Sequence, residues 1–532
     1  MTTIAIDFGT SNTVVCILNP DTQTPESLRF GDISRIFKIK RASGELQEIP
    51  VVPTLVFVRG RGNLELGEKV RSQRLGQSQP ERLFQAFKRD LAADFQPPPR
   101  QIDDEIYTPG SVAQQFIKAI WEQLHQQKIQ PDRVIFTVPV GAFERYLDWF
   151  RDLAENLGVS EVQLVDESTA AALGYAVKHP DSLVLVVDFG GGTLDLSLVR
   201  TATITPQIAK RELRGNLLRA EVLAKSDAYV GGEDIDIWIV EDYLRSIGSS
   251  RTEVGKVGWQ NLLEIAERLK IQLSKADEAK ESWFDDENFM SYDLHLSREK
   301  FEEILESQQL LEQLRQALDE VLSLALGKGI GKADIEKVLL VGGTCLIPAV
   351  YNLAISYFGR QKVKMDKPFE AVAHGALALT EFVTVEDYLR HSYAIRLWEP
   401  HTKSYSYSPI FDKGMKYPCQ SSEPLALQVA IEGQREIRLD IGELGEVSQA
   451  EVTFNERGQM TSSQLHKQTE FRSLESERQQ VCVAHLHPPG QLGIDRVSVS
   501  FEVDEGRVLL ATVEDLVTGM VLVERGAIAK LK

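Results

Sequence analysis

The sequence predicts a duplicated α/β domain followed by an all-β domain. Up to about residue 380, apolar runs rich in Val, Ile and Leu alternate with amphipathic segments, whereas after residue 395 only short strand-like segments follow one another. These two patterns are typical of α/β proteins and of β-sandwiches, respectively. A third observation is that the motif at residues 4–18 returns in similar form at residues 185–199. We therefore expect an α/β domain at 1–383, a linker at 384–394 and a β-sandwich at 395–532.

The composition restricts the partners that the protein can have. With 532 residues, 43% of them hydrophobic, the chain is long enough for more than one buried core. A formal net charge of −19 argues against nucleic acid and against an anionic membrane surface as partners. Nucleotide phosphates remain compatible with this charge, because backbone amides and Mg²⁺ can hold them locally.

The cysteines and the first residues indicate a reducing, cytoplasmic location. The four cysteines contain no CxxC pair, so we expect reduced and mostly core-filling thiols. The first residues lack a basic segment and reach Asp7 early, unlike a signal peptide. The apolar run at 338–355 is interrupted by glycines and by Pro348, which favours a strand, a turn and a helix over a membrane span. The cysteines are Cys16, Cys345, Cys419 and Cys482.

The periodicity predicts the individual elements. Runs rich in β-branched residues predict strands, and apolar stripes at helical spacing predict helices. In the first region we expect strands at 3–8, 14–18, 133–140, 182–189, 194–199 and 337–343, and helices at 113–127, 142–158, 262–275 and 298–326. In the second region we expect strands at 425–432, 435–441, 449–454, 479–487, 496–503, 507–515 and 520–526.

The repeated motif predicts a phosphate-binding loop in each copy. In the first copy a strand ends at Asp7, and Gly9, Thr10, Ser11 and Asn12 form a tight turn. Glycine allows a ligand to approach the backbone, amides and hydroxyls can bind phosphate oxygens, and the acid can hold a hydrated Mg²⁺. An ordinary hairpin with a polar turn is the structural alternative for this copy.

The second copy runs from Asp188 through Gly190, Gly191 and Gly192 to Thr193 and Asp195. Three consecutive glycines are costly in conformational entropy, and a plain turn needs fewer. A flexible loop is the alternative explanation of these glycines. Two such loops in one chain can hold a triphosphate between them.

Further motifs carry a family resemblance. Residues 1–383 resemble, in motif order, the nucleotide-binding domain of the 70-kDa heat-shock chaperones, which belongs to the actin and sugar-kinase fold group. The resemblance implies a two-lobed, actin-like ATPase domain that hydrolyses ATP to ADP and phosphate with Mg²⁺. The motifs are VPVGAFERYLDWFRDLAENLG, VDESTAAALGYA, VGGEDID, ERLKIQLSKA, LSREKFEEIL, VLLVGG and EAVAHGAL.

The resemblance also implies roles for individual residues. Lys88 would reach the γ-phosphate and the attacking water, Glu167 would orient that water, and Asp195 and Thr193 would support the step. Asp7 and Asp188 would hold Mg²⁺ through its waters. A single lysine or glutamate is usually a surface charge, so these roles depend on the joint pattern. The residues implied to bind nucleotide are Gly9, Thr10, Ser11, Asn12, Gly190, Gly191, Gly192, Thr193, Gly231, Gly232, Glu267, Lys270, Ser274, Gly342, Gly343 and Thr344.

The expected adenosine site departs from the family pattern. Glu267, Lys270 and Ser274 share one helix face, as a solvated face also would, and the resemblance implies that this face holds ribose and adenine. Leu346 and Ile271 stand where the family often has arginine. Losing cation–π stacking costs about 1 kcal/mol, so we expect weaker nucleotide binding. Phe369 replaces a usual aspartate, and Ser168 replaces a proline after Glu167.

The second region resembles, faintly, the β-sandwich half of the family's peptide-binding domain. We expect no helical lid, and therefore fast peptide exchange. The Leu-rich linker of the family is altered here to DYLRHSYAI, which puts coupling between ATP turnover and peptide release in doubt. The implied partners are unfolded or extended client peptides, a J-domain co-chaperone and a nucleotide exchange factor. His485 and His487 share one strand face and are expected to be surface residues rather than metal ligands.

The main hypothesis is thus an ATP-dependent chaperone that couples Mg²⁺-ATP binding and slow hydrolysis to the binding of extended peptides. A nucleotide-sensing scaffold with little turnover and an actin-like filament protein are the alternatives. A small-molecule kinase of the same fold would need a catalytic base in the first lobe, and the sequence offers no candidate for it.

Overall fold

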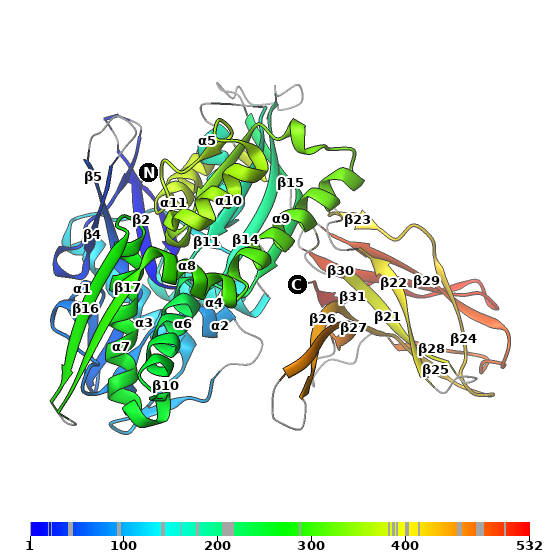
Figure 1. Ribbon diagram of the computed structural model, residues 1–532. Coiled ribbons are helices and arrows are strands. Elements are labelled where there is room, and N and C mark those ends of the chain that lie inside the picture. The colour runs from blue at the N-terminus through cyan, green and yellow to red at the C-terminus, as the bar shows by residue number, and fades with distance from the viewer. Residues whose placement is uncertain are drawn as a thin grey trace. The chain divides into compact units, whose positions relative to one another are not determined.

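The structure is a computed structural model that separates into two compact units, residues 1–385 and 386–532, and each is described by itself. Figure 1 shows the chain coloured from its N-terminus to its C-terminus. The described residues are 2–531 except 20, 23, 41–45, 93–96, 140–143, 160, 177–178, 180, 205–216, 287–288, 381–382, 386–388, 390–391, 400–403, 413–414, 416, 455–459, 475–482 and 505–506.

The first unit is a mixed α/β structure that contains two similar sheets. In the first sheet the order is β12-β11-β1-β2-β5-β4, and β3 also pairs with β2. Strand β1 is antiparallel to β2 and parallel to β11, which is parallel to β12. The strands are β1 (Thr3–Phe8), β2 (Asn12–Leu18), β3 (Pro25–Ser27), β4 (Arg35–Lys40), β5 (Leu46–Pro53), β11 (Arg133–Val138) and β12 (Glu161–Asp166).

The second sheet repeats this arrangement, with the order β19-β18-β13-β14-β15-β20. Strand β13 is antiparallel to β14 and parallel to β18, which is parallel to β19. Strands β13 and β1 therefore hold equivalent positions, and each leads through a glycine turn into an antiparallel neighbour. The strands are β13 (Leu183–Phe189), β14 (Leu194–Ile204), β15 (Leu217–Ala228), β18 (Lys337–Val341), β19 (Val363–Lys364) and β20 (Val383–Val385).

The helices of the first unit differ from the expectation in more than one place. The segment 262–275, expected as a helix, largely lies in a helix that begins earlier, at Arg251. The segment 298–326, expected as one helix, forms α8 (Arg298–Ser307) and α9 (Leu310–Gly327). Gln309 between them has a φ of 57°, which ends the helical path. Helix α6 packs on both α7 and α8, and the three helices can be followed in Figure 1. The other helices are α1 (Glu68–Ser72), α2 (Phe87–Ala92), α3 (Pro109–Gln126), α4 (Glu144–Leu157), α5 (Glu167–Ala176), α6 (Gly232–Ser246), α7 (Arg251–Leu273), α10 (Pro348–Phe358) and α11 (Ala371–Ala376).

Helices α5 and α11 connect the two sheets. Helix α11 packs on β1 and β2, α5 packs on β13 and β14, and the two helices pack on each other. They meet at glycines, because a Cβ atom on Gly375 would lie 1.8 Å from the carbonyl oxygen of Ala170. A Cβ atom on Gly174 would lie 2.8 Å from the Cα atom of Gly375. A buried apolar cluster with residues from both sheets surrounds this crossing, and it includes Ala5, Val14, Val184 and Val186.

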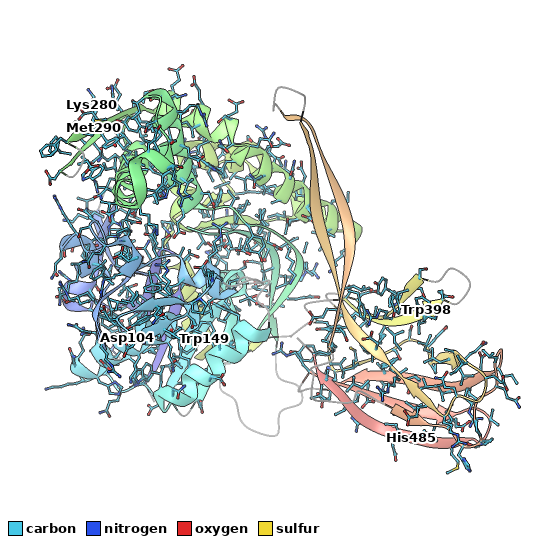
Figure 2. The ribbon with its side chains drawn as sticks, turned by 90° about the horizontal axis from the view of Figure 1, so that it is seen from below. Asp104, Trp149, Lys280, Met290, Trp398 and His485 are labelled. Carbon is cyan, nitrogen blue, oxygen red and sulfur yellow. The ribbon has the colours of Figure 1, made fainter. Side chains whose placement is uncertain are left out.

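Shorter elements extend the first unit. A three-stranded sheet has the order β7-β6-β8, and β9–β10 and β16–β17 are hairpins. Figure 2 labels Lys280 and Met290 on the β16–β17 hairpin. These strands are β6 (Val56–Gly60), β7 (Asn63–Leu66), β8 (Leu83–Phe84), β9 (Arg100–Ile102), β10 (Glu105–Tyr107), β16 (Glu278–Asp285) and β17 (Met290–Ser297). Among the described residues, no helix has the length and apolar character needed to cross a membrane.

The second unit contains strands and no helix within its described residues. One sheet has the order β22-β21-β26-β27, another has the order β23-β29-β30-β31 with β24 beside β29, and β25 pairs with β28. Side chains of β21 and β29 share one buried cluster, so the two larger sheets enclose a common core. The strands are β21 (Ser392–Glu399), β22 (Ser404–Phe411), β23 (Cys419–Gln420), β24 (Leu425–Gln428), β25 (Glu436–Arg438), β26 (Asp440–Phe454), β27 (Met460–Ser473), β28 (Val483–His485), β29 (Asp495–Val503), β30 (Val508–Asp515) and β31 (Met520–Lys530).

Several sequence expectations for this part of the chain need qualification. The segment 384–394, expected as a linker, includes the end of β20 and the start of β21. Its residues 386–388, 390 and 391 lie outside the described residues, as does Cys482. His485, labelled in Figure 2, is 76% exposed at its side chain and lies 3.4 Å from a carboxylate oxygen of Glu436.

Candidate functional site

The two glycine loops predicted from the sequence lie in direct contact. The first loop, residues 9–12, joins β1 to β2, and the second, residues 190–193, joins β13 to β14. A Cβ atom on Gly191 would lie 1.9 Å from the Oγ atom of Ser11. A Cβ atom on Gly192 would lie 3.0 Å from the Oγ1 atom of Thr10. Glycine at position 191 is therefore what allows the loops to approach this closely.

Each loop is held by a threonine from elsewhere in the chain. Thr54 donates from its backbone nitrogen to the Ser11 carbonyl at 2.9 Å and from Oγ1 to the Gly9 carbonyl at 2.8 Å. Thr344 donates from Oγ1 to the Gly190 carbonyl at 2.7 Å. These bonds fix the backbone of each turn, and backbone amides of such a turn can bind an anion. The sequence predicted Thr344 but not Thr54.

The Gly231–Gly232 turn and the start of α6 support the second loop. The nitrogens of Gly232 and Glu233 donate to the carbonyl oxygens of Gly190 and Gly191, at 3.1 and 2.9 Å. Glu233 also accepts a hydrogen bond of 3.0 Å from the Ser11 hydroxyl, so it joins both loops. Burial raises the pKa of Glu233 to about 7. Glu233 belongs to the VGGEDID motif, yet its role was not predicted.

Three aspartates lie behind the loops. Asp7 and Asp188 end equivalent strands, and Asp195 lies opposite Asp188 in the β13–β14 ladder. Burial and the neighbouring charge of Glu167 raise the pKa of both Asp7 and Asp195 to about 7. The same two causes, with Asp7 added, raise the pKa of Asp188 well above its ordinary value. Thr137 donates to Asp7 at 2.8 Å, which partly offsets the shift there.

Lys88 and Glu167 form a buried ion pair beside these aspartates. The distance between Lys88 Nζ and Glu167 Oε1 is 2.8 Å, and each side chain is 8% exposed. Burial lowers the pKa of Lys88, but Glu167 outweighs this effect, so the pKa lies above its ordinary value. The lysine is therefore charged at neutral pH. Helix α2 supplies Lys88, and Glu167 is the first residue of α5.

This set of carboxyl groups fits a hydrated divalent cation. Asp7, Asp188 and Asp195 lie near Glu167, and Lys88 is the cation that opposes their raised pKa values, which burial causes first and the charge of Glu167 second. A divalent cation would relieve the repulsion between these carboxylates. Within the described residues no three His, Cys, Asp or Glu side chains converge on one metal position. Carboxylates of this kind can hold a Mg²⁺ ion that keeps several of its waters.

Of the three residues expected on the adenosine side, Glu267 and Lys270 lie on α7 and Ser274 follows its last residue, and each is bonded within the protein. Glu267 pairs with Arg71 at 2.6 Å and with Arg35 at 3.3 Å. Burial would raise the pKa of Glu267, but these two arginines lower it to about 2. The arginines come from residues far from α7 in the sequence, which is why they were not predicted.

Lys270 and Ser274 have partners of their own. Lys270 Nζ lies 2.7 Å from Asp236 Oδ2 and donates to the Gly232 carbonyl at 2.5 Å. Ser274 donates to the Lys270 carbonyl at 3.1 Å. Lys270 thus ties α7 to the start of α6, directly behind the second loop.

One cavity of about 1020 Å³ joins these groups. Every site residue predicted from the sequence lines it except Gly231 and Asp195, which support the lining from behind. Of the four positions that depart from the family pattern, Ile271, Leu346 and Phe369 also line it, and Ser168 does not. Its size matches that of a nucleotide-binding cleft.

Comparisons with known proteins agree with this geometry. A family model described as Hsp70 protein matches residues 91–387, which includes the second loop and excludes the first. The chain is 24% identical to the chaperone protein DnaK of Thermosipho melanesiensis over 97% of this chain and 78% of that protein. It is 25% identical, with the same coverage, to the chaperone proteins DnaK of Thermosipho africanus and Thermotoga maritima.

Proposed function

The chain belongs to the Hsp70 protein family, and on this premise we propose that it is an ATP-dependent chaperone that hydrolyses Mg²⁺-ATP slowly to regulate its binding of extended peptide segments. The two similar sheets support a duplicated, two-lobed actin-like domain at 1–383 as the nucleotide-binding part. The shared core of the second unit supports a β-sandwich at 395–532 as the peptide-binding part, with the linker between them. We place the protein in the cytoplasm, as a partner of J-domain and nucleotide-exchange proteins.

The contact between the two glycine loops is the observation that carries the nucleotide-binding proposal. Both loops follow an acid that ends an equivalent strand, and Gly191 lies against Ser11. Phosphate groups would bind the turn amides together with the hydroxyls of Thr10, Ser11 and Thr193. Mg²⁺, when bound, would neutralise phosphate charge and polarise the phosphoryl group.

Lys88 and Glu167 carry the hydrolysis proposal. A lysine held charged in a buried site stabilises the negative charge that develops on the transferred phosphoryl group. The Glu167 carboxylate would accept a hydrogen bond from the attacking water and orient it. Asp195, buried beside them, would hold Thr193 and that water in position. Such a reaction depends mainly on positioning and charge, which these residue types supply.

An exposed aromatic pair supports peptide binding by the second unit. Trp398 of β21 lies directly opposite Tyr405 of β22, their ring centroids are 5.1 Å apart, and they are 49% and 53% exposed. Arg396 lies over the Tyr405 ring at 4.6 Å and helps to fix it. Figure 2 labels Trp398 at the surface. Exposed aromatic side chains of this kind bind apolar segments of extended chains.

A nucleotide-sensing scaffold with little turnover is the second candidate. It is favoured by the internal bonds of Glu267 and Lys270, which a nucleotide would have to share or displace. In this case the cleft would bind ATP and change conformation without efficient hydrolysis.

A single-turnover assay distinguishes the two candidates. The chaperone proposal expects Mg²⁺-ATP hydrolysis that falls at least about 100-fold in Lys88→Ala and in Thr193→Ala, and that responds to an unfolded apolar peptide. If the wild type binds ATP, and if the hydrolysis rate is equally negligible in the wild type and in both variants, the scaffold is established instead. Absence of ATP binding at millimolar nucleotide would contradict both candidates.

A further inference from the structure

The cavity between the loops and α7 is lined by charged groups and by apolar side chains. The charged groups include the acids behind the glycine loops and Lys88. The apolar lining includes Phe37, Ile271, Leu346, Met365 and Phe369. A nucleotide also combines charged phosphates with a flat ring, and its base would lie against the apolar lining.

Two phenylalanines from distant parts of the sequence meet in this apolar lining of the cavity. The rings of Phe37, on β4, and Phe369, which precedes α11, are parallel within 9°, with their centroids 4.6 Å apart. The Phe369 ring also packs against the Gly342–Gly343 turn, which the sequence predicted to contact the nucleotide. A Cβ atom on Gly343 would lie 3.2 Å from the Cε1 atom of Phe369. The aromatic pair therefore borders the cavity beside the Gly342–Gly343 turn.

Strand β4 runs along the part of α7 that faces the cavity. Arg35 contacts Glu267 at 3.3 Å, and Lys275 donates to the Lys38 carbonyl at 3.4 Å. Phe37 lies between these two contacts on β4, as Ile271 lies between them on α7. Arg35 also lies over the Phe37 ring at 4.7 Å, so the ring is held in place. Phe37 thus belongs to the wall that would enclose a base.

We propose that Phe37 and Phe369 form the surface on which the base of the bound nucleotide stacks. The proposal rests on the proposed nucleotide-binding function and names the residues that recognise the base. A ring separation of 4.6 Å is direct contact, so the base stacks on the outside of the pair rather than between the rings. Because Leu346 and Ile271 provide no hydrogen-bonding groups beside it, stacking area decides the preference. Purines are favoured over pyrimidines for this reason.

The test compares a ligand that has a base with a ligand that lacks one. Isothermal titration calorimetry measures Mg²⁺-ATP, Mg²⁺-CTP and Mg²⁺-tripolyphosphate on the wild type, Phe37→Leu, Phe369→Leu and the control Phe289→Leu. Leucine retains apolar packing and removes the π face, and Phe289 is an 81% exposed residue outside the cavity lining. Thermal unfolding of each variant establishes that it is folded.

The expected result is that Phe37→Leu and Phe369→Leu weaken ATP binding about tenfold each, reduce the preference for ATP over CTP, and leave tripolyphosphate binding unchanged. Phe289→Leu should leave all three affinities unchanged. Unchanged ATP affinity in both cavity variants, or equal weakening of ATP and tripolyphosphate, overturns the stacking proposal while nucleotide binding stands. Failure of the wild type to bind either ATP or tripolyphosphate removes the proposed function itself.

A second measurement does not depend on variants. The triphosphate of 2-aminopurine riboside loses fluorescence when its base stacks on an aromatic ring. Quenching on binding to the wild type, reversed by excess ATP, supports the proposal, and binding without quenching contradicts it.

Discussion

Lys88 and Glu167 form an ion pair with 2.8 Å between Nζ and Oε1, and both side chains are almost completely buried. The pair joins α2 to the first residue of α5, so it connects the edge of the cavity to the helix that packs on the second sheet. Removing one partner leaves the other charge buried without a counter-charge, whereas removing both charges does not. A single and a double variant can therefore separate the contribution of the pair to stability from its contribution to activity.

We expect Lys88→Ala to lower the free energy of unfolding by about 3–5 kcal/mol, because it leaves Glu167 buried without its cation. Single-turnover hydrolysis should fall at least about 100-fold in the same protein. The double variant Lys88→Met/Glu167→Gln should recover most of the stability and none of the activity. Urea unfolding and rapid-quench assays measure both quantities, and an unchanged unfolding midpoint in Lys88→Ala would contradict the first expectation.

Gly191→Ala should abolish nucleotide binding, because the new methyl group would lie 1.9 Å from Ser11 Oγ and push the loops apart. Gly327→Ala is the matched control, because Gly327 ends α9 outside the cavity lining and a Cβ atom there would meet no heavy atom within 4 Å. We expect the control to bind Mg²⁺-ATP within about threefold of the wild type, since surface-like changes cost little. Equal affinities for the two variants in a titration would show that loop contact does not matter.

Arg71→Met should speed nucleotide release about tenfold, because the Arg71–Glu267 contact of 2.6 Å joins two residues of the cavity lining and ties α1 to α7. Stopped-flow displacement of a fluorescent ATP analogue measures this rate. The control is Arg59→Met, which removes a surface contact to Glu65 at 2.9 Å. A release rate that is the same in both variants would exclude this restraint.

His374 should make stability depend on acid pH. Burial, with a smaller contribution from Lys367, lowers the pKa of His374 to about 3, and the ring also contacts Ser27 at 3.0 Å beside Glu370. The unfolded chain therefore binds one more proton than the folded chain between pH 6.5 and 3. The contribution of neutral, buried His374 to the free energy of unfolding is therefore fully present above pH 6.5. As the pH falls below 6.5 it is lost, by up to about 1.4 kcal/mol per pH unit.

The comparison that isolates this effect uses His374→Gln, because the carboxyl groups of the protein also titrate in this range. Urea unfolding at several pH values should give a shallower loss of stability for the variant than for the wild type. Parallel curves would mean that His374 does not carry the dependence.

Trp398→Ser should weaken the binding of an extended apolar peptide about tenfold, by removing the larger ring of the exposed pair with Tyr405. Ile431→Ser is the matched control, because Ile431 is a 65% exposed apolar residue of the same unit. Fluorescence anisotropy of a labelled peptide measures both affinities. Equal losses in the two variants would indicate general surface hydrophobicity rather than a site.

The strands that the sequence predicted are those with continuous apolar runs. Strands β1, β13 and β18 are buried along most of their length, so their composition identifies them. Strand β27 was not predicted because its sequence is largely polar. The break between α8 and α9 was missed because the apolar spacing continues through Gln309, whose backbone conformation is not visible in the pattern.

The site was predictable where its chemistry is local. Glycines and acids close together in the sequence identified both loops, and the structure places them in contact. Thr54, Arg71 and Phe37 were not identified, because each acts on a residue of a distant segment. These residues have a role only through contacts in three dimensions, of Thr54 with the first loop, of Arg71 with α7 and of Phe37 with Phe369.

Gly174 and Gly375 place two helix backbones against each other with no side chain between them. The distance between the two sheets therefore depends on these two glycines, because α11 packs on the first sheet and α5 packs on the second. An alanine at either position would have to push the two helices apart, and this would disturb the buried apolar cluster that residues of both sheets form around the crossing.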